Sequence, residues 1–483
     1  MIFVILLDVI VFISLFYVNA KKGFEETLPM AAFFLIIFPE ESKVPLGLFD
    51  ITTQRLVTLI LIFLAIISRK RAGTHRRKLP LKIWILAIAF WWTLATVNSI
   101  AFTDSLKALL ALFLDYLVIY FLFATYVTSV NTVRRILLGI AGGLILCSVF
   151  GCLEAYANWS VVTLFPTEVH RFGTSGALYL DDARGLRVQS TFGHPILFGS
   201  ALAMGIPMTL YLIATARKRI QKIYLWIGLL FMFTCIFKTS SRGPWIALTL
   251  SLIPFLFFGL PRIRKYILII CLFAVTVLVV RPGVTETIWN DYMATVDDHS
   301  SQGESYQYRY ELYHLVMEKL DQSPLRAIWG YGPQSFPFLH LSGSINGRGM
   351  EFVSCDSSIA ALLVETGYIG ISLIGFVFLY ILLTAFRTFR RASRPNDQLC
   401  ILFFANLSAF YFEMTNVAIL GWGQQTILLW VIIAMTMIYP SLLRAERAAS
   451  RNAIPLDLQN RDIDSTMRVL SPARISWELP DQI

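Results

Sequence analysis

Residues 357–386 read SSIAALLVETGYIGISLIGFVFLYILLTAF and contain one charged side chain, that of Glu365. A run of about 20 apolar residues is long enough for a helix to cross a bilayer. Asp356 precedes this run, and Arg387 and Arg390 follow it. Because only helices and closed barrels satisfy every backbone polar group in lipid, the length and composition predict a transmembrane helix.

Other apolar segments of this kind lie along the whole chain, and with this one they make thirteen candidates. They cover residues 2–18, 28–38, 55–68, 82–99, 106–129, 133–153, 193–214, 221–237, 244–259, 266–280, 357–386, 399–415 and 424–439. The second and third are short for a bilayer of about 30 Å, so they either tilt or form a re-entrant pair. We therefore expect 12 to 13 membrane spans.

The composition of the 483-residue chain agrees with that expectation. Hydrophobic residues make up 56% and charged residues 15%, which excludes a soluble enzyme, a disordered chain and a fibrous repeat. The net charge is +10, from 41 basic and 31 acidic residues. Most of the excess lies in short loops between apolar segments, so it reports orientation in the membrane rather than nucleic-acid binding. The predicted class is an all-α, polytopic membrane protein without a nucleic-acid partner.

Basic residues mark alternate loops. Cytoplasmic loops of membrane proteins carry an excess of Lys and Arg. That excess occurs at residues 69–78, 134–135, 217–219, 262–265 and 387–394. We therefore place these loops and the C-terminus in the cytoplasm, and two long loops outside. Thirteen spans would also put the N-terminus outside.

This topology divides the chain into four regions. They are an N-terminal bundle (1–153), a first outer loop (154–192), a core (193–440) that includes a second outer loop (281–355), and a mostly disordered cytoplasmic tail (441–483). In the second loop, residues 304–320 predict an amphipathic helix, because Leu312, Val316 and Leu320 share one face. Ser323-Pro324 ends that helix.

The cysteine and histidine patterns argue against metal and disulfide chemistry. The six cysteines form no CxxC pair, and five of them lie in or beside apolar segments. These features argue against a disulfide framework and a cysteine zinc site. The scattered histidines contain no HExxH motif. The first segment lacks a basic leading region and a small-residue cleavage site, so we expect it to be a retained span.

Three arginines lie at the outer ends of predicted spans or in the outer loops. Arg242 follows Thr239-Ser240-Ser241 and begins a span, where its planar fork and the free N–H groups of a helix start suit a phosphate. Arg309 lies among tyrosines of the loop helix, and Arg187 precedes a segment that enters another span. The simpler alternatives are interfacial anchors for Arg187 and Arg242 and a surface ion pair for Arg309.

Asp356 has two open interpretations. At the outer end of a helix, its carboxylate can accept a proton from a sugar hydroxyl as a general base. Asp is also a preferred helix N-cap, and the helix dipole would then lower its pKa. The two roles are not exclusive.

Four more carboxylates lie inside apolar segments, namely Asp8, Asp115, Glu365 and Glu413. Carboxylates within the membrane are functional hypotheses by default. Glu365 comes nine residues after Asp356, so the two face opposite sides of a helix that turns about 100° per residue. We expect hydrogen-bonded packing roles for most of the four.

The motifs, taken in order, resemble the O-antigen ligase and polymerase family of bacterial envelope proteins over roughly residues 187–385. The pattern comprises Arg187 through Pro195, Ser241-Arg242-Gly243, Arg309 ahead of Gly330-Tyr331-Gly332 and Phe336, and Asp356-Ser357 followed after nine residues by Gly367-Tyr368-Ile369-Gly370. The resemblance implies the GT-C fold of membrane glycosyltransferases, without metal or cofactor. It also implies a location in the bacterial inner membrane, with the active site facing the periplasm.

The resemblance further implies that the substrate is an undecaprenyl-pyrophosphate-linked glycan in the lipid bilayer. It implies that Arg242, Arg309 and Arg187 bind the donor pyrophosphate and that Arg242 and Arg309 act in catalysis with Asp356. Asp356 stands where ligases of the family carry a catalytic His, which favours polymerisation of repeat units in O-antigen, capsule or exopolysaccharide synthesis. A lipid flippase and a chain-length regulator are the candidate partners.

Three alternatives to a polymerase stay open. The first is ligation of the glycan to lipid A-core. The second is transport of a lipid or polysaccharide, which should place paired charges near the bilayer midplane, whereas these arginines gather at the outer surface. The third is a non-catalytic scaffold, which would lack a groove reaching the lipid.

Overall fold

The computed structural model describes residues 2–44, 50–69, 79–165, 174–175, 178–181, 184–280, 286, 293, 301–346, 348–391, 398–421 and 423–452. The predictions for the basic loop at 70–78, for the start of the second outer loop and for the tail after residue 452 lie outside these residues. The chain divides into two compact units, Met1–Ile438 and Tyr439–Ile483. The features below belong to the first unit, and the described part of the second is the end of the last helix.

Helices form most of the described structure. They are α1 (Ile2–Lys22), α2 (Phe24–Ile37), α3 (Thr53–Arg69), α4 (Lys82–Val97), α5 (Phe102–Ala111), α6 (Val118–Tyr126), α7 (Val130–Ala157), α8 (Pro195–Thr215), α9 (Arg219–Lys238), α10 (Arg242–Phe258), α11 (Pro261–Val280), α13 (Ser301–Asp321), α14 (Pro324–Trp329), α15 (Ser358–Arg390), α16 (Leu399–Asn416) and α17 (Gly423–Asn452). A π-helical turn, Leu112–Leu117, joins α5 to α6, and 3-10 turns cover Val161–Leu164 and Phe336–Leu339. Each of the thirteen predicted segments coincides with one of these helices or with the continuous α5–α6 rod.

Eight helices in the described residues are long and apolar enough to cross a membrane. They are Ile2–Lys22, Phe102–Tyr126, Val130–Ala157, Pro195–Thr215, Arg219–Lys238, Ser358–Arg390, Leu399–Asn416 and Gly423–Ala449. Three shorter helices, α3, α4 and α10, are also apolar. The predicted all-α, polytopic membrane class is therefore confirmed. The count of 12 to 13 spans and the GT-C architecture stay predictions.

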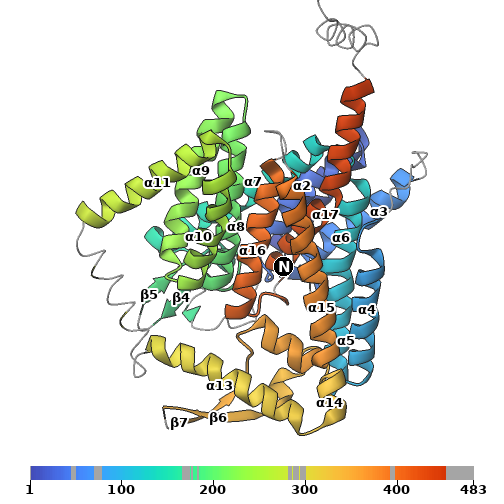
Figure 1. The fold of residues 1–483 in the computed structure, drawn as a ribbon, viewed down its shortest axis with the longest axis vertical. Coiled ribbons are helices and arrows are strands. Elements are labelled where there is room, and N and C mark those ends of the chain that lie inside the picture. The colour runs from blue at the N-terminus through green and yellow to red at the C-terminus, as the bar shows by residue number, and fades with distance from the viewer. Residues whose placement is uncertain are drawn as a thin grey trace, which may run out of the picture. The chain divides into compact units, whose positions relative to one another are not determined.

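Helix α8 lies at the centre of the bundle and contacts α7, α9, α10 and α16 (Figure 1). Nearly all of its side chains are buried. Small residues allow this close packing: a Cβ added at Gly199 would lie 2.7 Å from Pro244, and one at Gly205 would lie 2.5 Å from Leu144. Interfaces between membrane helices are enriched in such residues because the backbones can then approach closely.

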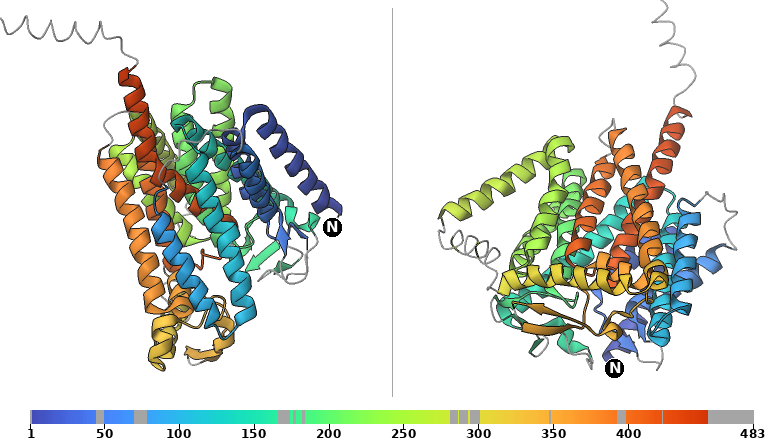
Figure 2. Two further views of the ribbon diagram at one scale, coloured as in Figure 1. Left: turned by 90° about the vertical axis from the view of Figure 1, so that its right-hand side faces the viewer. Right: turned by 60° about the horizontal axis from the view of Figure 1, so that its bottom comes forward.

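Residues 301–346 and 348–352 form a small subdomain at one end of the bundle, at the bottom of Figure 1. It contains α13, α14 and the β6–β7 hairpin, and Figure 2 shows α13 lying across the bundle with the hairpin beside it. Its core is built on Leu312, Val316 and Leu320, which are completely buried. The predicted amphipathic helix is confirmed, with its end at Asp321 and the next helix beginning at Pro324.

The strands form three small antiparallel sheets. They are β1 (Lys43–Val44) with β2 (Ile51–Thr52), β3 (Thr174–Ser175) with β4 (Leu178–Asp181) and β5 (Gly185–Arg187), and β6 (Leu341–Ile345) with β7 (Arg348–Phe352). In the second sheet Tyr179 pairs with Arg187, and in the third Leu341 pairs with Phe352. The first sheet lies between α2 and α3, the second between α7 and α8, and the third between α14 and α15.

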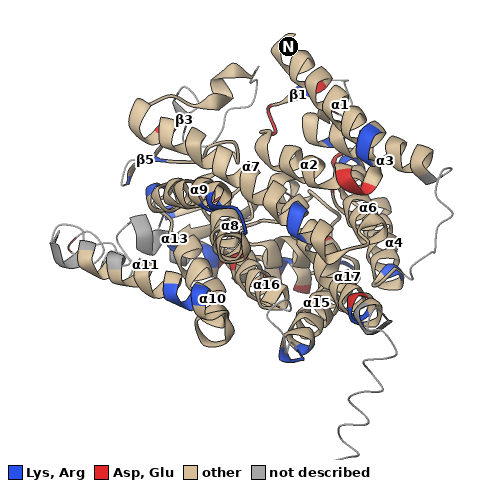
Figure 3. Cartoon of the chain, turned by 90° about the horizontal axis from the view of Figure 1, so that it is seen from above, with Lys and Arg blue, Asp and Glu red and all other residues tan. Residues whose placement is uncertain are grey.

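Basic residues gather at the end of the bundle opposite this subdomain. Seen from above, Lys and Arg mark the start of α11 and the end of α15 (Figure 3). These are Arg262, Arg264 and Lys265 on α11, and Arg387 and Arg390 in the last turn of α15. The fold thus places two of the predicted cytoplasmic basic clusters at one end and the subdomain at the other.

Candidate functional site

Arg242 begins α10 immediately after a sharp turn. The turn is made possible by Ser240, whose φ of 48° reverses the chain after α9. Ser241 occupies the N-cap position, but its side chain caps no backbone N–H of α10. Its hydroxyl donates instead to the Thr239 carbonyl oxygen at 2.9 Å. The first-turn N–H groups beside Arg242 therefore receive no side-chain cap from Ser241, which is the arrangement that suits an anion.

Arg187 stabilises this turn through hydrogen bonds. It donates to the Thr239 carbonyl oxygen at 3.0 Å, to Ser241 Oγ at 2.8 Å and to Asp181 Oδ2 at 3.1 Å. Its guanidinium also lies over the ring of Tyr179, and only 4% of the residue is exposed. A buried guanidinium with three polar protein partners positions the turn rather than presenting a charge at the surface.

His194 lies next to Arg187 and caps α8. Its Nδ1 accepts a hydrogen bond from the backbone N–H of Ile196 at 3.2 Å, and its ring meets Tyr179 edge-on. Burial, aided by the Arg187 charge, lowers the pKa of His194 to about 4. The imidazole is therefore neutral at physiological pH, and its fixed Nδ1 acceptor leaves the proton on Nε2.

Arg309 lies on α13, which is tied to the segment leading into α15. Tyr308 donates to the Ser354 carbonyl oxygen at 2.8 Å and stacks on Phe352, and the hydroxyls of Tyr313 and Ser357 lie 2.6 Å apart. Arg309, between these two attachments, acts electrostatically on Asp356. Two motifs separated by 47 residues in the sequence are thereby joined.

Asp356 precedes α15, and Ser357 is the residue that caps the helix. The Ser357 hydroxyl accepts from the backbone N–H of Ala360. The interpretation of Asp356 as the N-cap is therefore wrong, because a cap position holds a single residue and Ser357 fills it. The expected fall in its pKa is also wrong. Protein atoms packed around the carboxyl raise the pKa of Asp356, and they outweigh the opposing effects of Arg309 and Ser354, although the side chain still reaches solvent.

Glu413 on α16 lies beside the first turn of α10, although the sequence pattern favoured a packing role for it. The residue is 1% exposed, and its carboxylate oxygens lie 3.2 Å from where a Cβ of Gly243 would stand, beside the first turn of α10. Arg309 acts on it electrostatically, and the Ser200 hydroxyl faces it while donating to Ile196 at 2.8 Å. Among the described residues, neither oxygen of Glu413 has a donor in hydrogen-bond geometry. In the sequence, the one indication of a functional role for Glu413 was its position inside an apolar segment.

The other three intramembrane carboxylates have the predicted packing roles. Asp8 accepts from the Thr53 hydroxyl at 2.8 Å, and Asp115 pairs with Arg55 at 3.0 Å. Glu365 accepts from the backbone N–H of Gln334 at 2.9 Å. The protein partners of these three groups do not include Arg242 or Arg309, so Glu413 differs from them.

The two glycine motifs meet at a break in α15. Gly367 has a φ of 67° and interrupts the helix, which frees carbonyl oxygens that the helix would otherwise use. The N–H groups of Tyr331 and Gly332 donate to the carbonyls of Val364 and Glu365, at 2.9 and 3.0 Å. The indole of Trp91 donates to Thr366 O at 2.9 Å. The turn after α14 thus serves as the hydrogen-bonding partner of the broken helix.

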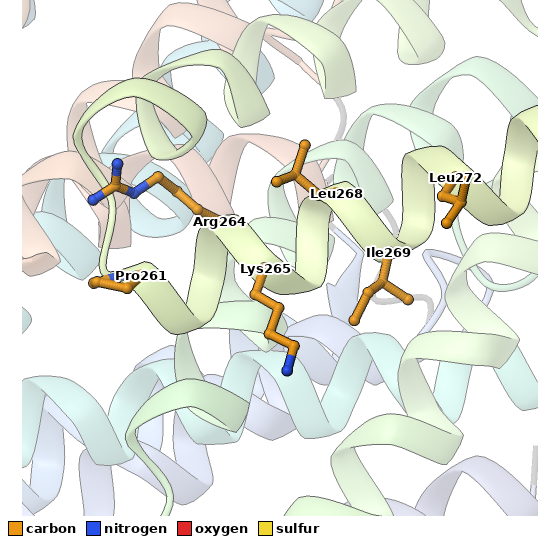
Figure 4. Close-up of a pocket in the computed structure, with 6 residues that line it drawn as sticks. All are labelled: Pro261, Arg264, Lys265, Leu268, Ile269 and Leu272. Carbon is orange, nitrogen blue, oxygen red and sulfur yellow. The ribbon is translucent and has the colours of Figure 1, made fainter.

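A hollow of about 540 Å³ lies on α11, away from these residues. It is lined by Pro261, Arg264, Lys265, Leu268, Ile269 and Leu272, as Figure 4 shows. The lining contains no carboxylate and none of the candidate residues. In the described part of the chain, no group of three or more His, Cys, Asp and Glu side chains is placed to hold a metal ion.

A comparison with models of known protein families matches part of this chain. Residues 227–375 match a family model described as O-antigen ligase. The match contains Arg242, Arg309, Asp356 and both glycine motifs, while Arg187 and Glu413 lie outside it. No curated protein matches the chain. The similarity of this chain to the O-antigen ligase family therefore covers residues 227–375.

Proposed function

We propose that this protein polymerises lipid-pyrophosphate-linked oligosaccharide repeat units on the outer face of the bacterial inner membrane. The observation that carries the proposal is the position of Arg309. It interacts electrostatically with Asp356 before α15 and with Glu413, whose carboxylate lies against the α10 turn that begins at Arg242. In our proposal, these three motifs, far apart in the sequence, supply two cations and a carboxylate to one site.

The leaving group in such a transfer is a lipid pyrophosphate. As the bond between the first sugar and the phosphate oxygen breaks, negative charge develops on that oxygen. Arg242, supported by the N-terminus of α10, and Arg309 are the groups that stabilise this charge in our proposal. Planar guanidinium groups suit this task because each binds two phosphate oxygens.

Asp356 is the proposed general base. It accepts the proton of the acceptor hydroxyl while the oxygen of that hydroxyl forms the new glycosidic bond. A raised pKa strengthens the carboxylate as a base, and its exposure to solvent leaves it reachable by an acceptor sugar. Arg309 acts electrostatically on Asp356. In our proposal it also binds the donor pyrophosphate, and it would thereby align the base with the leaving group.

Glu413 and Arg187 are proposed as positioning residues. A buried carboxylate needs a nearby cation, and Glu413 meets that need by holding Arg309 towards α10. Arg187 keeps the Ser241 hydroxyl on the Thr239 carbonyl oxygen and away from the helix N–H groups. In this proposal Arg187 acts on the donor through the turn, instead of binding the pyrophosphate directly.

The test is polymer formation by the purified protein from lipid-linked repeat units. A ladder of products on the lipid carrier supports polymerisation. The family description names a ligase, so a parallel reaction should contain lipid A-core as acceptor. Product on lipid A-core alone would favour ligation, and movement of intact substrate across vesicles without any new glycosidic bond would favour transport.

A further inference from the structure

Two cysteines from neighbouring helices lie in contact. The Sγ atoms of Cys152 on α7 and Cys235 on α9 are 3.7 Å apart, and both cysteines are free. Cys235 also contacts the Ser148 carbonyl oxygen at 3.1 Å. Neither thiol belongs to the candidate site.

Glycines explain why these helices are close enough for a thiol pair. A Cβ at Gly151 would lie 2.8 Å from Cys235 Sγ, and a Cβ at Gly228 would lie 2.4 Å from Ile145. The side chains of one helix thus reach the backbone of the other. A disulfide needs Cα atoms about 4.4–6.8 Å apart, a separation that such close packing permits.

The pair lies near the ends of both helices that lead towards the candidate site. Cys235 is three residues before Lys238 at the end of α9, and Cys152 is five residues before Ala157 at the end of α7. At a rise of about 1.5 Å per residue, these positions are roughly 5 and 8 Å from the helix ends. Cys152 is partly exposed, whereas Cys235 is buried. Cys152 is therefore the more accessible of the two thiols.

We propose that Cys152 and Cys235 are an oxidation site that forms a disulfide between α7 and α9. The co-reactant is an external disulfide. The Cys152 thiolate attacks one of its sulfur atoms, which gives a mixed disulfide and releases one thiolate. The Cys235 thiolate then attacks Cys152 Sγ and releases the second thiolate. One S–S bond is formed and one is broken, and the two thiol protons and two electrons end on the reduced co-reactant.

The cross-link would restrict the movement of α7 and α9, the two helices on which the segment beside the Arg242 turn packs. The backbone N–H of Val188 donates to the Lys238 carbonyl oxygen at 3.0 Å, and a Cβ at Gly151 would lie 2.9 Å from the Val188 side chain. Val188, next to Arg187, thus rests on both helices that the disulfide joins. This consequence rests on the proposed function and its outward orientation, whereas the chemistry of the pair does not.

The experiment uses the full-length protein in detergent and oxidised glutathione as the probe. After oxidation, the protein is unfolded in detergent, free thiols are alkylated with a maleimide, and the digest is analysed by mass spectrometry. We expect a peptide pair joined through Cys152 and Cys235 that disappears on reduction, with loss of maleimide from both residues. We also expect the oxidised protein to unfold at a higher temperature than the reduced protein.

The variants separate the pair from general thiol reactivity. Cys147→Ser is the matched control, because Cys147 lies on the same helix but contacts Thr191, and it should leave the cross-link intact. Cys235→Ser should trap glutathione on Cys152 and lose the oxidant-dependent rise in unfolding temperature. Full alkylation of both cysteines in oxidised wild type, or glutathione remaining on Cys152 there, would overturn the proposal. Because no glycan is used, failure of the proposed function cannot produce either result.

Discussion

Replacement of Gly367 by Ala tests whether the fold depends on the break in α15, against which α14 packs. Gly367 has φ 67° and ψ −174°, which L side chains rarely adopt. A Cβ there would stand 2.3 Å from the carbonyl oxygen of Ile328 and 2.8 Å from that of Ala327. Both atoms belong to the backbone of α14, so the clash cannot be relieved by rotating a side chain.

The expected cost can be worked from these contacts. The unfavourable backbone conformation costs about 1–3 kcal/mol. Moving α14 away from the break loses one or two of the hydrogen bonds made by Tyr331 and Gly332, at about 0.5–1.5 kcal/mol each. The sum is a destabilisation of roughly 1.5–6 kcal/mol.

Gly375→Ala is the matched control, since Gly375 lies eight residues later in the same helix. No atom lies within 4 Å of a Cβ at this position, and the backbone is helical. Ala should be neutral or stabilise the helix by about 0.5–1 kcal/mol. The assay is thermal unfolding of both purified variants in detergent, followed by circular dichroism. An unfolding temperature of Gly367→Ala equal to or above that of wild type would refute the proposed role of the break.

The remaining predictions concern the charged groups. Arg242→Ala and Arg309→Ala should abolish polymer formation while the protein still inserts in the membrane, and Lys at either position should restore little because a point charge loses the two-oxygen geometry; normal polymer length in both Ala variants would exclude the pyrophosphate role. Asp356→Asn should lower the initial rate about 10²–10⁴-fold, and wild-type turnover would remove Asp356 from the mechanism. A base works only when it is deprotonated, and the pKa of Asp356 is raised from 3.8, so the wild-type rate should begin to fall above pH 3.8 as the pH is lowered. Asp356→His should be partly active, and the acidic limb of its pH–rate profile should move towards pH about 6.5. Arg187→Ala should raise the donor KM more than it lowers kcat, because the Ser241 hydroxyl would then be free to cap the N–H groups of α10. Adding Ser241→Ala removes that hydroxyl and should partly restore the donor KM. Equal loss of activity in Arg187→Ala and in the double variant would indicate a purely structural role. Glu413→Gln should lower kcat with normal expression, and unchanged kinetics would return Glu413 to a packing role.

The sequence alone determined the features that depend on local pattern. Uninterrupted apolar runs must form helices in lipid, because no water is present to satisfy the backbone, and every predicted segment is helical. The four-residue spacing of Leu312, Val316 and Leu320 likewise specified the buried face of α13. The ordered arginine, aspartate and glycine motifs were sufficient to indicate the resemblance to the O-antigen ligase family, whose model matches residues 227–375.

Only the tertiary structure decided how these motifs combine. Ser357, and not Asp356, caps α15, because the two neighbours are equally good caps by composition and only the chain path selects one. Arg309 acts electrostatically on Glu413, which is more than 100 residues away in the sequence. Arg187 is buried against the turn before α10, although its sequence position was equally consistent with an exposed side chain. Gly367 meets α14, and Cys152 meets Cys235, through close backbone approaches. The physical reason is the same in each case: periodicity and capping act over a few residues, whereas the pairing of charges, glycines and thiols depends on which helices pack together.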